Sequence, residues 1–227
     1  MNRENWDYRA FIIVIFGSVQ FIILTFIAMF FYKGGTYINS STSHYIFWYN
    51  YFSDLGRYIS HSGVLNLVSF ILFTTTLALW GISQIPFYIA FLRFFIESKN
   101  LKKIAYISSI FGVLTGIYYV GIAFTPSDLI DNLHDLFVFL GFSSIFICMS
   151  LYSIVIYKVE KYPNFYANIL IISTIILGIY FTTLFLIQNI NLTTRLIISV
   201  VGQKIMIYTL LVSCIIQGCG ALRQFNS

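Results

Sequence analysis

Two short runs of charged residues and histidine carry the spacing that places side chains on one face of a helix. The first run, spaced i, i+3 and i+7, is Asp54, Arg57 and His61, which share a face if the helix that follows begins early. The second run, spaced i, i+3 and i+4, is Asp131, His134 and Asp135. Both runs stand at the ends of long apolar segments, so their side chains are expected at the edge of a membrane.

These residue types suggest two kinds of chemistry. His61, His134 and one or two of the aspartates could hold a metal ion that activates water. Alternatively, His134 could act as a general base that Asp131 orients. However, the sequence contains neither the H-x-x-x-H nor the H-E-x-x-H spacing of known metal motifs, so no metal ligand is assigned and the cofactor is left open.

Lys204 adds a positive charge to this region. It lies about 12 Å from the nearer end of the last apolar segment, where a lysine is costly unless it finds a partner or water. With Arg57, it could bind a lipid phosphate. The predicted ligand-binding residues are Asp54, Arg57, Asp128, Asp135 and Lys204.

A structural role for the same residues is the alternative. Asp128 and Asp131 stand near a helix start, where negative charge is favourable, and Ser127 or Asp128 could cap that helix. Arg57 could pair with Asp54 as a neighbour on a helix. The sequence therefore leaves three possibilities open: a structural network, a ligand site without chemistry, and a catalytic site.

The composition decides what kind of protein carries these groups. Of the 227 residues, 59% are hydrophobic and 9% are charged, and so little charge cannot cover a water-facing surface of this size. The net charge is +5, but the positive residues form no basic stripe with interleaved aromatic residues. Nucleic acid is therefore not predicted as a partner. The Ile, Tyr, Phe and Asn richness suggests a prokaryotic source with an A·T-rich genome.

Six apolar runs are long enough to cross a bilayer as helices, since a crossing needs about 20 residues. An open sheet cannot cross, because its edge would leave backbone groups unpaired in lipid. We therefore predict an all-α, polytopic membrane protein with a single domain over residues 1–227. The six predicted spans are residues 10–32, 63–85, 103–124, 134–157, 165–188 and 196–219.

The second run is longer than one crossing requires. It continues almost without polar residues from Val64 to Ile96, and Pro86 interrupts it. We predict a span that bends near Pro86 and continues to Glu97. In the third run, Gly112 and Gly116 stand four residues apart, which predicts close packing against another helix.

The positive residues predict the orientation, because they favour the cytoplasmic side. Only Lys33, Arg57 and Arg195 fall on the other side, and Lys204 lies within a span. Both termini are therefore predicted in the cytoplasm of a cell-membrane protein, with every histidine at or near the outer edge. The nine residues on the predicted cytoplasmic side are Arg3, Arg9, Arg93, Lys99, Lys102, Lys103, Lys158, Lys161 and Arg223.

Two longer motifs carry a resemblance to a known family. The sequence NYFSDLG at 50–56 precedes a span that contains NLVSFILF, and GIAFTPSDLIDNLHDLFVFLGF follows at 121–142. The chain resembles the uncharacterised prokaryotic six-span family catalogued as domain of unknown function 998, and is more distantly similar to the Frag/DRAM/Sfk group. The matched positions are Ser53, Asp54, Leu55, Gly56, Pro126, Asp128, Leu133 and His134.

The resemblance implies six spans and marks the same edge of the membrane, but it implies no reaction. The chain departs from the pattern in that Gly121 stands five residues before Pro126. Some members of the more distant group are linked to lipid remodelling or to membrane lipid organisation. Membrane lipids are therefore the expected partners.

Three functions fit the sequence. The first is a lipid-binding or lipid-modifying protein, which predicts that Asp54, His134 and Lys204 come within bonding reach of one another. The second is a non-catalytic accessory subunit of a larger membrane complex. The third is a small-solute or ion transporter, which the mostly apolar residues expected at mid-membrane disfavour. Whether the protein is an enzyme is left open.

Overall fold

A computed structural model of the chain describes residues 3–96, 101–160 and 162–226, and within these residues it contains helices and turns but no strand. Six helices are long and apolar enough to cross a membrane, which confirms the all-α, six-span prediction. They are α1 (Arg3–Phe31), α2 (Leu67–Phe91), α3 (Lys102–Ala123), α4 (Asp131–Lys158), α5 (Asn164–Leu186) and α6 (Leu192–Asn226). The predicted Glu97 end of the second span, Lys99 and Lys161 lie outside the described residues.

The second span begins later than predicted and continues past Pro86 as predicted. It begins at Leu67, not at residue 63, and it continues as an α-helix through Pro86. A 3₁₀ segment, η2 (Leu92–Phe95), then extends it. Proline removes one backbone hydrogen bond, but α2 keeps its helical assignment for five residues beyond it.

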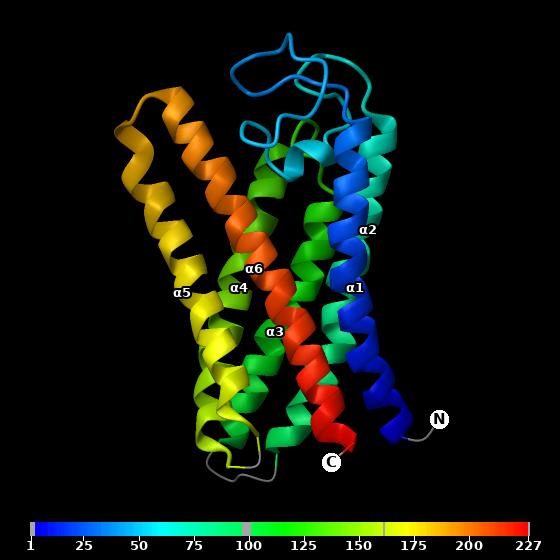
Figure 1. Ribbon diagram of the computed structural model, residues 1–227, viewed down its shortest axis with the longest axis vertical. Helices are drawn as coiled ribbons and strands as arrows, with labels where there is room; N and C mark the ends of the chain where they lie inside the picture. The colour runs from blue at the N-terminus through cyan, green and yellow to red at the C-terminus, as the bar shows by residue number, and fades with distance from the viewer. Residues whose placement is uncertain (1–2, 97–100, 161, 227) are drawn as a thin grey trace.

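The helices form a ring in chain order, in which each packs against the next and α6 closes on α1 (Figure 1). The beginning of α1 and the end of α6 lie at one end of the bundle, which we call the terminal end. At the opposite end, the loop end, residues 32–66 fold over the helices. We call these residues the cap.

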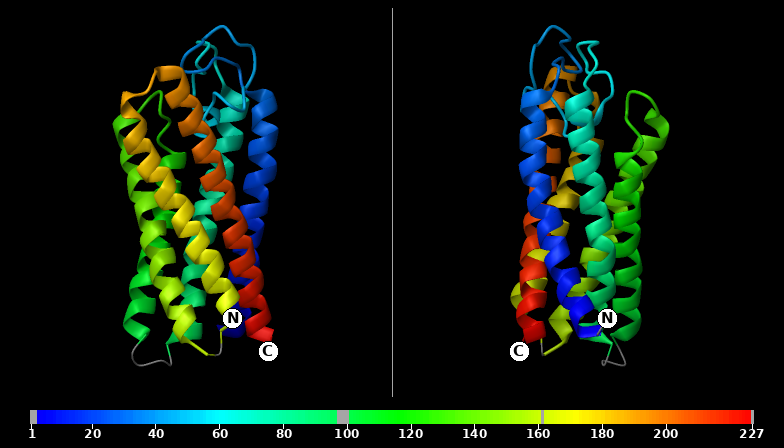
Figure 2. Two further views of the ribbon diagram at one scale, coloured as in Figure 1. Left: turned by 60° about the vertical axis from the view of Figure 1, so that its left-hand side comes forward. Right: turned by 90° about the vertical axis from the view of Figure 1, so that its right-hand side faces the viewer.

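The first and last helices are close at the terminal end and separate toward the loop end (Figure 2). Near the terminal end, a Cβ added to Gly218 of α6 would lie 2.7 Å from Ile15 of α1, so the two backbones lie close together there. Toward the loop end, α6 leans away from α1. The cap covers the space that this divergence opens.

Small residues and one buried glutamine join neighbouring helices. A Cβ on Gly81 would lie 2.7 Å from the carbonyl oxygen of Gly116, and a Cβ on Gly112 would lie 2.3 Å from the ring of Tyr88. The predicted packing role of Gly112 and Gly116 is thus confirmed. Gln20 of α1 donates to the carbonyl oxygen of Thr76 of α2 at 2.9 Å, which satisfies polar groups deep in the bundle.

The cap has little regular structure, and its own polar side chains hold it together. It contains one short 3₁₀ helix, η1 (Ser53–Gly56). Gly34, Gly35 and Gly63 adopt positive φ angles of 80–86°, which other residues rarely adopt. The Asn66 side chain accepts from the Lys33 amide at 3.3 Å and donates to the carbonyl oxygen of Arg57 at 3.0 Å, so it ties both ends of the cap together.

Candidate functional site

A cavity of about 320 Å³ lies beneath the cap, between all of the long helices except α5. Its deeper walls are apolar and aromatic, and its polar residues come from the cap, from the α3–α4 connection, from α4 and from α6. Trp80 and Tyr119 stack in the deeper wall, with ring centroids 4.8 Å apart. The apolar lining consists of Phe21, Phe52, Phe73, Leu77, Trp80, Tyr119, Ile122, Val138, Phe142 and Ile207.

Both predicted runs of polar residues line this cavity. They are Asp54, Arg57 and His61 from the cap, and Asp131, His134 and Asp135 from the start of α4. The reason predicted for the first run is wrong, because α2 begins only at Leu67 and the three residues share no helix. Asp54 lies in η1, Arg57 follows it, and a turn brings His61 back.

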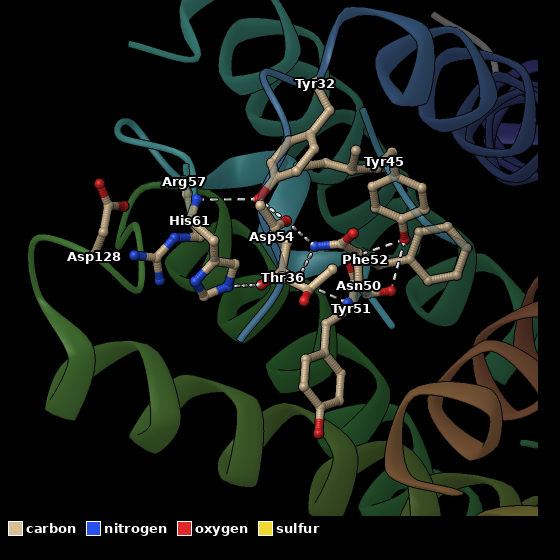
Figure 3. A network of polar contacts seen from close by, with 12 residues as sticks. Tyr32, Thr36, Tyr45, Asn50, Tyr51, Phe52, Asp54, Arg57, His61 and Asp128 are labelled. Carbon is tan, nitrogen blue, oxygen red and sulfur yellow. Dashed lines mark hydrogen bonds and ion pairs between the residues drawn. The ribbon is translucent and has the colours of Figure 1, made fainter. Parts of the chain in front are cut away.

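Asp54 is the centre of a hydrogen-bond network in the cap (Figure 3). It is 5% exposed, and its Oδ2 accepts from the Asn50 side chain at 3.0 Å and from the Tyr51 amide at 2.9 Å. Its Oδ1 lies 3.1 Å from Nε2 of His61. Because the carboxylate has three partners, its burial is compensated, and its first role is to hold the cap.

Asn50, which the sequence did not single out, is the second centre of this network. It is fully buried, its Oδ1 accepts from the Ile46 amide at 2.9 Å, and its Nδ2 also donates to the carbonyl oxygen of Gly35 at 2.9 Å. The hydroxyl of Tyr45 donates to the Asn50 carbonyl oxygen at 3.0 Å. Its place three residues before the S-D-L-G element, within the NYFSDLG run, was the signal that could have found it.

Three tyrosines of the cap stay protonated beside this network. Burial raises the pKa of the Tyr32 and Tyr45 phenols above the ordinary value, and the negative charge of Asp54 raises both further. Burial also raises the pKa of Tyr51. These hydroxyls are therefore hydrogen-bond donors at neutral pH, as the bond from Tyr45 requires.

Lys204 contacts the cap but does not line the cavity. It is 2% exposed, its Nζ donates to the carbonyl oxygen of Asn50, and it lies 4.8–5.5 Å from the ring centroids of Tyr45, Phe47 and Phe52. Such contacts with aromatic rings stabilise a desolvated cation. Lys204 therefore has the partners that a lysine within a span was expected to need, and these partners belong to the cap.

Gln203 does line the cavity. Its Oε1 accepts from the amide of Phe52 at 2.9 Å. Two successive residues of α6 thus fasten the cap from below. The expected direct meeting of Asp54, His134 and Lys204 is not found, because each has its own partner in the described chain.

Asp128 holds the cap to the α3–α4 connection. Its carboxylate accepts from the amides of Tyr58 at 3.0 Å and Ile59 at 2.7 Å. It does not cap α4, whose N-cap is Ile130. Among the described residues Arg57 forms no ion pair with Asp54: its Nε donates to the carbonyl oxygen of Ile59 at 3.2 Å, and its two terminal nitrogens have no described partner.

His134 is buried in the cavity wall with a defined tautomer. Its Nδ1 lies 2.7 Å from the carbonyl oxygen of Thr125, and a carbonyl only accepts, so Nδ1 carries the proton. In the neutral ring, Nε2 is then an acceptor, and no described residue bonds to it. The Thr125 carbonyl, not Asp131 as predicted, orients this ring.

The two remaining carboxylates, Asp131 and Asp135, are exposed at the rim. Among the described residues, no group of three His, Cys, Asp or Glu side chains is placed to hold a metal ion. The positions of His61, His134 and the aspartates thus do not support the metal alternative. The rim instead presents one guanidinium, two carboxylates and one imidazole acceptor.

The two motifs behind the family resemblance meet at this cavity. The S-D-L-G element is η1 itself, in which Leu55 is fully buried and a Cβ on Gly56 would lie 2.5 Å from the ring of Phe73. The second motif supplies Asp128 and His134. No family model matches the sequence, and no curated protein or solved structure matches it significantly. The function is therefore argued from the cavity.

Proposed function

We propose that the protein binds an amphiphilic lipid in the cavity beneath the cap, with the loop end at the outer leaflet of the cell membrane. One observation carries the proposal: the cavity beneath the cap, within a bundle of helices long and apolar enough to cross a membrane, has charged groups at its rim and aromatic and aliphatic side chains below. Its volume of about 320 Å³ is at the lower end of ligand pockets, which favours one chain or a ring system over a whole two-chain lipid.

The rim favours a head group with both signs of charge. The free nitrogens of Arg57 suit a phosphate oxygen, because guanidinium binds phosphate in a fork geometry. Asp131 and Asp135, on the other side of the rim, suit an ammonium or hydroxyl group, and Nε2 of His134 accepts a further donor. The proposal is binding without chemistry, since no described nucleophile or metal set lies in bonding reach of His134.

Filling the cavity tests this proposal. Leu77 of α2 is 5% exposed and lines the cavity, whereas Leu79 is 45% exposed and does not line it. We expect the Leu77→Trp variant, purified in mild detergent, to retain at least about tenfold less lipid by native mass spectrometry. The same change in Leu79→Trp should leave the retained lipid unchanged.

Two further variants make the result decisive. Leu77→Phe fills less space and should reduce lipid retention in part, which guards against a tryptophan variant that fails to fold. Arg57→Gln should weaken retention of phosphate-containing lipids by roughly tenfold, since a charge-assisted hydrogen bond contributes about 1.5–3 kcal/mol. A folded Leu77→Trp protein that retains as much lipid as the parent would overturn the proposal.

A further inference from the structure

A second cleft, of about 350 Å³, lies between the loop-end tips of α5 and α6. The 3₁₀ segment η3 (Ile187–Asn189) forms one side of it, and the first turns of α6 form the other. Tyr37 and Tyr51 of the cap line both this cleft and the cavity beneath the cap, so the two spaces share a wall.

Arg195 is the charged group of this cleft. It is half-buried, and the one hydrogen-bond partner of its guanidinium among the described residues is the carbonyl oxygen of Gln188, which accepts a long hydrogen bond of 3.4 Å from Nη1. A guanidinium has five donor positions, so most of its capacity is unused. No Asp or Glu is among the described residues that line the cleft, so no carboxylate there compensates its charge.

The other half of the cleft is apolar. Leu184, Ile187, Leu192 and Leu196 line it, and the neighbouring Phe185 is 81% exposed on the outer surface of α5. Arg195 is the fourth residue of α6, and at the end of a membrane-spanning helix an arginine side chain is expected to meet lipid head groups. A ligand of this cleft must therefore combine an anionic group with an apolar part.

We propose that this cleft binds an anionic lipid of the leaflet at the loop end, with its phosphate on Arg195 and its apolar part against the leucines of α5 and α6. This site goes beyond the cavity proposed above and does not depend on what the cavity holds. The shared tyrosines place the two ligands on opposite sides of one aromatic wall.

The test uses a photoactivatable phosphatidylglycerol in nanodiscs, with the crosslinked peptides mapped by mass spectrometry. We expect crosslinks within residues 184–199, at a yield roughly tenfold lower in Arg195→Gln. Arg223→Gln, which removes an exposed arginine from the other end of the same helix, is the matched control and should give the parent yield. Leu77→Trp, which fills only the cavity, should also leave these crosslinks in place.

Three outcomes would overturn the proposal. The first is an unchanged yield in Arg195→Gln, and the second is an equal yield from a matched phosphatidylcholine probe. The third is complete competition by millimolar inorganic phosphate, which would show a site for the free anion and not for the lipid. Loss of cavity lipid in Leu77→Trp with the cleft crosslinks retained would separate the two sites.

Discussion

Single residues decide how the cap can remain folded over a cavity. Asn50 and Asp54 are almost completely buried, and each supplies bonds to backbone groups that a loop without regular structure would leave unpaired. Leaving these backbone groups buried without hydrogen bonds would lower the stability of the fold more than burying two polar side chains does. In the cap, polar side chains therefore provide hydrogen bonds that backbone groups provide for one another in a helix.

Removing the charge of Asp54 tests this role at the residue scale. Asp54→Asn keeps the shape but removes the negative charge that accepts from Asn50 and Tyr51 and faces Nε2 of His61. We expect a loss of about 1–3 kcal/mol in the free energy of unfolding, measured by thermal unfolding in detergent. Asp135→Asn, the same change at an exposed carboxylate, should have little effect. Equal effects of the two substitutions would contradict the role assigned to Asp54.

Among the helices, α2 and α3 approach each other closely, backbone to backbone, at Gly81 and Gly116, next to the floor of the cavity. Added Cβ atoms on Gly81 and Gly116 would each lie within 3.0 Å of backbone of the other helix, where neither side can yield by rotating a side chain. Gly81 also lies against Tyr119, which lines the cavity. The close packing of these two helices therefore holds the aromatic floor in place.

Alanine at this contact tests the packing. In a helix, glycine to alanine is favourable by about 1 kcal/mol when there is room. At Gly81 or Gly116 we expect the clash to dominate and to destabilise the protein by about 1–3 kcal/mol. Gly178→Ala is the control, because its nearest neighbour would be at an ordinary 3.6 Å. In thermal unfolding, the Gly178→Ala variant should have an unfolding temperature equal to or above that of the parent. An equally high unfolding temperature for Gly81→Ala would contradict the close contact of α2 and α3.

The whole molecule is polarised along its axis. The loop end carries the cap, the cavity and all three histidines, while nine of the thirteen positive residues are expected at the terminal end. The helices α1 and α6 diverge toward the loop end (Figure 1), and the cavity beneath the cap lies at that end. A ligand from a membrane would accordingly enter from one leaflet, which we predict is the outer one.

Labelling of intact cells checks that orientation. In a Cys219→Ser background, which removes the exposed native thiol, we expect Ser41→Cys in the cap to react with a membrane-impermeant maleimide. Lys158→Cys at the end of α4 should react only after the cells are permeabilised. The opposite pattern would place the cap in the cytoplasm and move the proposed lipid sites to the inner leaflet.

The number of spans and the region of the site followed from the sequence, because both depend on local composition. Hydrocarbon requires apolar side chains over a fixed length, so each helix is visible in its own residues. Charged residues beside the ends of those runs must lie at the ends of the helix bundle. His61, His134 and their aspartates thus line one cavity, as their positions suggested.

The partners of those residues were decided only by the tertiary structure. The sequence suggested Asp131 as the partner of His134, but Nδ1 of the ring bonds to the Thr125 carbonyl oxygen. It suggested a ligand phosphate as the partner of Lys204, but Nζ bonds to the Asn50 carbonyl oxygen and lies against three aromatic rings. Hydrogen bonds depend on distances that arise when the cap folds back on α4 and α6. Helical spacing cannot supply those distances in a segment that is not a helix, so the sequence located the site and the fold of the cap determined its contacts.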